Sequence, residues 1–459
     1  MNEFITRTMA AVSAVALLAG AAAGGSGTAI KTPSQAYSIE NLLAPVWEGN
    51  ESYQESVLVV EEADGSVAPI RLLYPIGQIR SVKSASLETV YKEGIDYSVA
   101  DGQLVILPTG SIPCLTYEEF HPQTGTAGFE DRDGGYVLWK EGSWFHDRQI
   151  VVTYTHTQAY TGYIPEGKGK LLPELRSKLT EGGSLNMLVY GDSISEGGNS
   201  SGSPLINVPP YMPIYPELFA EGLELRYGLE NVNVINASVG GKDSNWGISE
   251  IRTQVFERCT DLDVAIVAFG MNDTTRDAKS YAYNIKRIVS ALTKKYPGIA
   301  VLMVAPMLPN YQAQSFWGHQ AEFYDALKEL EGGGVVAVDV TGMHASLLNT
   351  KRYADMTGNN VNHANDYLAR IYAQTLLRTL EESDYGASAP GEGEQPLPDP
   401  DPGDGTGEER HETDVSENGG LGTGAVVGIA AGSAAALCLI AVAVVMLIKN
   451  KNRHNELSN

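Results

Sequence analysis

The pattern of apolar and polar positions changes once along this chain, near residue 182. Before that point, short apolar runs are separated by Gly, Asp, Pro and Ser; they cover 56–60, 70–74, 97–99, 104–107, 135–139 and 149–155. Runs of this length between turn residues predict β-strands, and no long helical period interrupts them. We therefore expect residues 39–165 to form an all-β domain of the sandwich or jelly-roll type.

After the change, strand-like runs alternate with helical stretches. The runs cover 186–190, 232–235, 264–269, 299–304 and 335–340. One helix between them is well marked, because Tyr281, Ile285 and Leu292 recur at helical spacing before a Pro297-Gly298 stop. This alternation predicts a parallel sheet with helices on both faces over residues 185–385. Active-site residues of such a sheet lie at the carboxyl ends of its strands.

Both ends of the chain carry apolar segments that belong to neither domain. Residues 1–25 have one arginine, an apolar stretch and small residues at Ala21 to Ala23, which predicts a secretory signal peptide. Residues 424–448 contain no charge over a length sufficient to cross a bilayer, and the cations of the tail 449–459 follow at once. We expect an exported protein held in the cell membrane by a single C-terminal helix, with its N-terminal part extracellular.

The segment between the second domain and the membrane helix, residues 386–423, is rich in Gly, Pro, Glu and Asp. Its composition predicts a disordered acidic stalk. The stalk carries part of the formal net charge of −24, so the acidity does not by itself describe a binding surface. A chain this acidic is not expected to bind nucleic acid.

Three cysteines do not make a disulfide framework. Cys438 lies in the membrane segment, and Cys114 and Cys259 fall in different predicted domains, so we expect them not to pair. No Cys/His cluster has metal-ligand spacing, and no Gly-rich loop is followed by Lys-Ser or Lys-Thr. We therefore expect no metal and no cofactor. The oligomeric state stays open.

Four short motifs follow one another in the second domain. Ser193 ends a Gly-Asp-Ser turn after the first strand, Gly241 follows the second strand, Asn272 follows the third, and His363 precedes the last helix. Serine, glycine, asparagine and histidine in this order resemble the SGNH (GDSL-type) hydrolase family, over roughly 185–380. The domain order is similar to that of carbohydrate esterases with an N-terminal jelly-roll domain. The resemblance implies a flavodoxin-like fold and ester hydrolysis.

The chemistry of these residue types agrees with that implication. A serine hydroxyl attacks an acyl carbon only when a base removes its proton, and a neutral imidazole accepts a proton near neutral pH. Ser193 is therefore the candidate nucleophile and His363 the candidate base. The resemblance implies that the oxyanion donors are the backbone N–H groups of Ser193 and Gly241 and the side-chain amide of Asn272.

One position departs from the family pattern, which usually has Asp three residues before the histidine. This chain has Asn360 there. An aspartate fixes the imidazole tautomer and stabilises the imidazolium, and an amide does neither reliably. Three alternatives stay open: a Ser-His dyad oriented by a backbone carbonyl, which we favour; Asp355 reaching in from the preceding loop; or weak or absent activity. Among the other histidines, His344 is a substitute base by topology.

We expect a serine esterase that removes small acyl groups, acetyl above all, from carbohydrate at the cell surface. A lipase or lysophospholipase-like esterase is the second enzyme alternative. A non-catalytic glycan-binding surface protein is the alternative from another class. The aromatic residues Tyr136, Trp139, Trp144 and Phe145 form either a sugar-stacking patch or ordinary packing.

Overall fold

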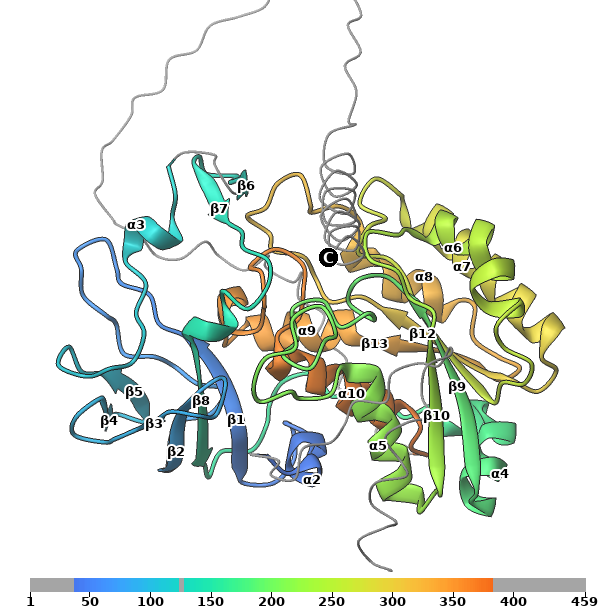
Figure 1. Ribbon diagram of the computed structural model, residues 1–459, viewed down its shortest axis with the longest axis horizontal. Helices are drawn as coiled ribbons and strands as arrows, with labels where there is room; N and C mark the ends of the chain where they lie inside the picture. Colours follow the sequence, from blue (N-terminus) through green and yellow to red (C-terminus); the bar gives the residue numbers. More distant parts are fainter. Residues whose placement is uncertain (1–36, 124–127, 383–459) are drawn as a thin grey trace, which may run out of the picture. The chain divides into compact units, whose positions relative to one another are not determined.

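The computed structural model describes residues 37–123 and 128–382 (Figure 1). The predicted signal peptide (1–25), stalk (386–423), membrane segment (424–448) and tail (449–459) lie outside these ranges, as does Cys438. Within the described ranges, no helix combines the length and the apolar character that crossing a membrane requires.

A five-stranded parallel sheet forms the second half of the described chain. Its strands are β9 (Ser184–Gly191), β10 (Asn231–Asn236), β11 (Val264–Ala268), β12 (Ala300–Ala305) and β13 (Val335–Asp339). They lie in the order β10-β9-β11-β12-β13, and each neighbouring pair is parallel. This is the flavodoxin-like order, in which the first strand lies between the second and the third. The predicted strands and their parallel arrangement are confirmed.

Helices cover both faces of this sheet (Figure 1). They are α4 (Pro173–Glu181), α5 (Tyr215–Tyr227), α6 (Ser244–Ile251), α7 (Ala278–Lys295), α8 (Phe323–Lys328), α9 (Val340–Leu348) and α10 (Asp366–Thr379). Alternate side chains of β9 enter two separate cores, because successive residues of a strand point to opposite faces. Met187 packs with residues of α5 and α10, whereas Leu188 packs with residues of α6 and α7.

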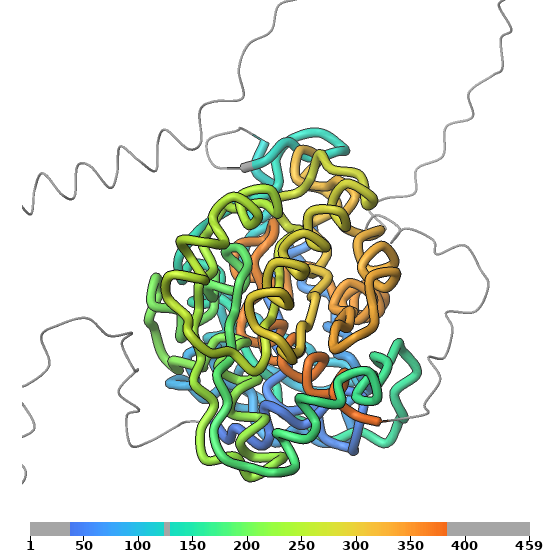
Figure 2. Tube along the Cα trace, turned by 90° about the vertical axis from the view of Figure 1, so that its right-hand side faces the viewer, coloured from blue at the N-terminus to red at the C-terminus, as the bar shows by residue number. Residues whose placement is uncertain are grey.

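The predicted helices begin where their caps are. The Asp277 side chain accepts a hydrogen bond from the Ser280 N–H at the start of α7, and Asn365 does the same for Leu368 at the start of α10. The short helix α2 (Ile39–Leu43) lies beside α10, and Gln374 donates to the carbonyls of Leu42 and Ala44. Figure 2 shows this blue segment close to the last, orange segment.

The first half of the described chain consists mainly of β-strands, as predicted, with the short helices α3 (Tyr117–Phe120) and η1 (His146–Arg148) between them. Its strands are β1 (Glu51–Leu58), β2 (Gln78–Ser84), β3 (Val90–Tyr91), β4 (Tyr97–Ala100), β5 (Gln103–Ile106), β6 (Gly128–Glu130), β7 (Tyr136–Leu138) and β8 (Gln149–Thr155). Four of them form an antiparallel sheet in the order β1-β8-β2-β3, and the pairs β4-β5 and β6-β7 form separate hairpins. The remaining short helices are η2 (Gly169–Leu171), η3 (Arg252–Phe256), η4 (Gln320–Glu322) and η5 (Tyr353–Asp355).

One predicted strand, 70–74, is not a strand, although Leu72 and Tyr74 are buried in the core of the β region. It lies between Pro69 and Pro75, which have no N–H to donate to a ladder. Only Ile70 pairs with another backbone segment, by exchanging hydrogen bonds with Leu104. Two later amides donate to side chains instead, Leu73 to Glu55 Oε1 and Tyr74 to the Tyr154 hydroxyl. The sequence missed β2, because its seven residues include only Ile79 and Val82 as apolar positions.

The four-stranded sheet is covered differently from the predicted sandwich. On one face, Val57 and Val152 pack with residues of the β4-β5 hairpin. On the other face, Ser56 and Gln149 hydrogen-bond to Asn365 of the α/β part. The described strands thus form a sheet between a hairpin and the α/β part, and the described residues lie within one compact unit.

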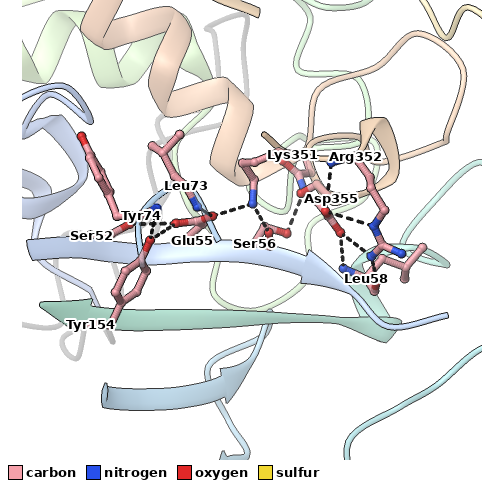
Figure 3. A network of polar contacts seen from close by, with 11 residues as sticks. Ser52, Glu55, Ser56, Leu58, Leu73, Tyr74, Tyr154, Lys351, Arg352 and Asp355 are labelled. Carbon is pink, nitrogen blue, oxygen red and sulfur yellow. Dashed lines mark hydrogen bonds and ion pairs between the residues drawn. The ribbon is translucent and has the colours of Figure 1, made fainter. Parts of the chain in front are cut away.

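A buried polar network joins the two parts (Figure 3). Lys351 Nζ lies 2.7 Å from Glu55 Oε1, and neither side chain is exposed to solvent. Glu55 also accepts from Tyr154 and Ser52. Buried charges are costly unless they are paired and hydrogen-bonded, and this pair meets both conditions. The network therefore fixes how the β region lies on the α/β part.

Candidate active site

Ser193 lies just beyond the carboxyl end of β9, which lies between β10 and β11 in the sheet. The strand ends at Gly191, where an added Cβ would lie 2.5 Å from the carbonyl oxygen of Ala268 on β11. Only glycine fits this close approach. The turn that follows is closed by Asp192, whose Oδ1 accepts from the Ile194 N–H at 3.1 Å. The turn leaves Ser193 half-buried at the edge of the sheet.

His363 lies on the loop between η5 and α10. The side-chain oxygen of Asn359 accepts from three successive backbone N–H groups of this loop, those of Val361, Asn362 and His363. The imidazole packs on Gly198, where an added Cβ would lie 3.1 Å from the ring. These contacts hold the ring in one place, and its side chain is 13% exposed.

The two predicted residues meet. His363 Nε2 lies 2.8 Å from Ser193 Oγ, and Nδ1 of the same ring lies 2.6 Å from Asn199 Oδ1. The orientation of the Asn199 amide is fixed in turn, because its Nδ2 donates to the carbonyl of Gly142 at 2.9 Å. An acceptor at Nδ1 requires that this nitrogen carry the proton. The unprotonated Nε2 then faces the serine hydroxyl, as a general base must.

The residues predicted to orient the histidine lie elsewhere. The side chain of Asn360 donates to the carbonyl of Leu138, and its φ of 65° turns the loop. Asp355 accepts from the Leu58 N–H and pairs with Arg352. Burial raises the pKa of Asp355, but the cations of Arg352 and Lys351 outweigh burial and lower it. Both residues support the interface with the β region. The group that contacts His363 Nδ1 is the side-chain amide of Asn199 and not a backbone carbonyl.

The predicted oxyanion donors lie at the same edge of the sheet. After β10, the chain runs alongside the carboxyl end of β9, because the Val239 N–H donates to the Gly191 carbonyl. Gly241 has a φ of +72° and no atom within 4 Å of an added Cβ. Asn272 follows β11 and donates from Nδ2 to the Lys242 carbonyl at 3.0 Å. This bond ties the second motif to the third.

Two residues of the site were missed in the sequence. Asn199 lies six positions after the serine in a Gly-Gly-Asn-Ser run that is typical of an ordinary loop. Glu141 comes from the β region, and its Oε2 lies 3.7 Å from His363 Nδ1. Burial raises the pKa of Glu141, but the contacts with His363 and with the Asn359 and Asn199 amides lower it below its usual value. No local pattern predicts either contact.

The other candidate residues have structural roles. His344 is fully buried and accepts from the Leu308 N–H through Nδ1, and burial lowers its pKa to about 3. It therefore cannot replace His363 as a base. Phe145 is fully buried, and Trp144 packs against it beneath Arg148. Trp139 is half-buried and donates to Glu141 at 3.0 Å, which places this aromatic residue beside the site. Cys114 and Cys259 are free thiols, as expected.

Asp192 makes the stability of the folded chain depend on pH. Its carboxyl is fully buried. Burial raises its pKa to about 7, against a lowering by the Ile194 and Met271 N–H groups and by the charge of His363. The unfolded chain loses this proton near pH 3.8. Between these values the folded state holds a proton that the unfolded state has released, so folding becomes less favourable as pH rises.

We expect the free energy of unfolding to fall between pH 4 and 7 and to level off above. The two pKa values correspond to a loss of roughly 4 kcal/mol from this group. Replacing Asp192 by Asn removes this titration. The free energy of unfolding in urea, measured for the variant and for the wild type at each pH, should therefore differ by an amount that changes by roughly 4 kcal/mol across the range. A difference that is constant from pH 4 to 8 would contradict the buried, proton-holding carboxyl.

Comparison with known proteins agrees with the motif order. Residues 189–376 match the model of the GDSL-like Lipase/Acylhydrolase family. No curated protein matches the chain. Similar solved structures include a two-domain esterase active on acetylated mannans, with 20% identity and a TM-score of 0.36; the match covers 48% of this chain and 55% of that one, so the chain spans about half its length.

Two further solved structures are similar over less than half of this chain. A catalytic mutant of an acetylxylan esterase from Geobacillus stearothermophilus has 15% identity and a TM-score of 0.36, and the match covers 44% of this chain and 96% of that one. A lipase from a goat rumen metagenome has 14% identity and a TM-score of 0.34, with coverage of 43% and 100%.

Proposed function

Residues 189–376 belong to the GDSL-like lipase/acylhydrolase family, and from this premise we propose that the chain is a serine esterase that removes small acyl groups, acetyl above all, from carbohydrate. The observation that carries the proposal is the line of contacts from Ser193 through His363 to Asn199. It provides a nucleophile, a base in the correct tautomer and a group that holds the base.

In the first half of the reaction, Ser193 Oγ attacks the acyl carbon and His363 Nε2 takes the hydroxyl proton. The carbonyl oxygen becomes an oxyanion, which the backbone N–H groups of Ser193 and Gly241 and the Asn272 amide receive. The tetrahedral intermediate then expels the alcohol, which takes the proton from Nε2, and the acyl group stays on the serine.

In the second half, His363 takes a proton from water while the water oxygen attacks the acyl-serine. Collapse of this second tetrahedral intermediate releases the carboxylic acid, and the proton on Nε2 returns to Ser193 Oγ. Every proton that leaves a nucleophile is thus returned to a leaving oxygen. The ring never has to turn, because Asn199 holds Nδ1 throughout.

The carbohydrate part of the proposal rests on two observations. The sequences of 1–25 and 424–448 support export and attachment to the cell membrane, with the site facing outward, where polysaccharide is an abundant source of esters. The β region brings half-buried Trp139 to Glu141, whose carboxylate lies 3.7 Å from His363 Nδ1, and aromatic rings favour the apolar faces of sugars.

The test is a substrate series with the purified full-length chain. We expect p-nitrophenyl acetate to be hydrolysed at least about ten times faster than the octanoate, since a site for small acyl groups gains nothing from a longer chain. We also expect release of acetate from acetylated xylan or mannan, measured by an enzyme-coupled assay. A preference for the octanoate would favour a lipase instead, and binding of polysaccharide without hydrolysis of any ester would favour a glycan-binding protein.

A further inference from the structure

A four-residue segment of the β region, residues 139–142, reaches the catalytic histidine. It begins directly after β7 and ends at Gly142, whose carbonyl receives the Asn199 amide. Between these points, Glu141 places Oε2 3.7 Å from His363 Nδ1. The Gly142 carbonyl therefore acts on the imidazole through Asn199, and the Glu141 carboxylate acts on it through its charge.

The Glu141 carboxylate is held in place, although its side chain is 46% exposed. Its Oε1 accepts from Trp139 Nε1 and from Asn359 Nδ2, each at 3.0 Å. Asn359 is the residue whose side-chain oxygen gathers the amides of the His363 loop. The carboxylate is thus tied to the loop that carries the histidine.

The hairpin that leads into this segment is anchored on the α/β part. The Arg132 N–H donates to the Gln312 carbonyl, and the Gln314 N–H donates to the Glu130 carbonyl. Val137 packs with Ala313 and Val361 in a small apolar cluster. These contacts lie on both strands of the hairpin, so the segment after β7 has a fixed starting point.

We propose that Glu141 is a positioning residue that supplies, from the β region, the negative charge that stabilises protonated His363 during ester hydrolysis. In the family pattern this charge belongs to an aspartate three residues before the histidine, where this chain has Asn360. Asn199 is neutral, so it aligns the ring without balancing its positive charge. The proposal rests on the esterase function. It assigns the two roles of that aspartate to two residues, alignment of the ring to Asn199 and balance of its charge to Glu141.

The test variant is Glu141→Gln, in which Oε1 still accepts from Trp139 and Asn359 and only the charge is lost. A charge at this distance, half screened by solvent, is expected to change kcat by roughly 10-fold. We expect kcat for p-nitrophenyl acetate to fall by that factor with KM unchanged. The acid limb of the kcat/KM profile should move to lower pH, because the imidazole loses its proton more readily without the carboxylate.

Two controls separate charge from structure. Glu130→Gln removes an exposed carboxylate from β6 of the same hairpin and should leave kcat and the pH profile as in the wild type. Raising the salt concentration should shrink the difference between wild type and Glu141→Gln, because a half-exposed charge is screened. Asp192 also acts on the charge of His363, but it is present in every variant and cancels in the comparison.

A Glu141→Gln enzyme with the wild-type kcat and pH profile would overturn the proposal. Failure of the esterase function itself would give a different result: the wild type would hydrolyse p-nitrophenyl acetate no faster than the Ser193→Ala variant. In that case, NMR titration of the His363 ring protons still decides: the proposal requires a lower midpoint in Glu141→Gln than in the wild type, and equal midpoints would refute it.

Discussion

Replacing Ser193 by alanine is expected to lower kcat for p-nitrophenyl acetate by on the order of 10⁶, the loss seen when the nucleophile of a serine hydrolase is removed. In the proposed mechanism Ser193 Oγ forms the acyl bond. It lies 2.8 Å from His363 Nε2, and among the described residues no other hydroxyl hydrogen-bonds to that nitrogen. Folding should be little changed, because the side chain is half-buried and the turn is held by Asp192 and Gly191.

The matched control is Ser195→Ala, two residues further along the same turn. Ser195 is fully buried and its hydroxyl contacts the Tyr215 hydroxyl at 2.7 Å, away from the histidine. This variant should lose about 1 kcal/mol of stability and keep most of its activity. An active Ser193→Ala enzyme, or a Ser195→Ala enzyme equally inactive while folded, would contradict the assignment of the nucleophile.

The second large effect is expected for Asn199→Ala, with a fall in kcat of about 10³ to 10⁴. Replacing the partner of the imidazole Nδ1 in a serine protease costs about 10⁴, because the ring adopts the wrong tautomer. Here the alanine removes the acceptor at 2.6 Å, so the proton is free to occupy Nε2 and block the attack on Ser193. Steady-state kinetics on p-nitrophenyl acetate measure the change, and KM should stay near the wild-type value.

Asn360→Gly is the control for this prediction. Asn360 occupies the family's aspartate position, but its side chain donates to the Leu138 carbonyl and not to the histidine. Glycine accepts its positive φ of 65° without strain. We expect this variant to lose some stability and to retain activity within about tenfold. Loss of activity in Asn360→Gly together with full activity in Asn199→Ala would reverse the roles of the two asparagines.

Much of the α/β part follows from sequence because its signals are local. The five parallel strands are apolar runs of the right length, and α7 and α10 begin at Asp and Asn caps that the sequence displays. The rule that active-site residues lie at the carboxyl ends of parallel strands places Ser193, Gly241 and Asn272 at one edge of the sheet, whereas His363, on the loop before α10, was expected there from the order of the motifs. These features depend on spacing and turn chemistry, which can be counted along one chain.

The partners of the histidine do not follow from sequence, because their roles depend on which loop packs against which. Asn199 aligns His363 only because the Gly142 carbonyl fixes its amide. Glu141 is near His363 only because the β6-β7 hairpin lies on the 310–317 loop. The same dependence explains the β region, whose second face is covered by the α/β part rather than by another sheet. A solvent-exposed strand and one that packs polar side chains on a neighbouring part carry the same pattern.

In the proposed mechanism, His363 is held by Asn199 and activates Ser193 as a nucleophile. The most direct measurement is mass spectrometry of the full-length chain after reaction with a p-nitrophenyl phosphonate, which forms a stable bond with an activated serine. We predict a single adduct on the peptide that contains Ser193, formed at a rate that falls at least about a hundredfold in His363→Ala. An adduct on another serine, or labelling of Ser193 at the same rate without the histidine, would contradict it.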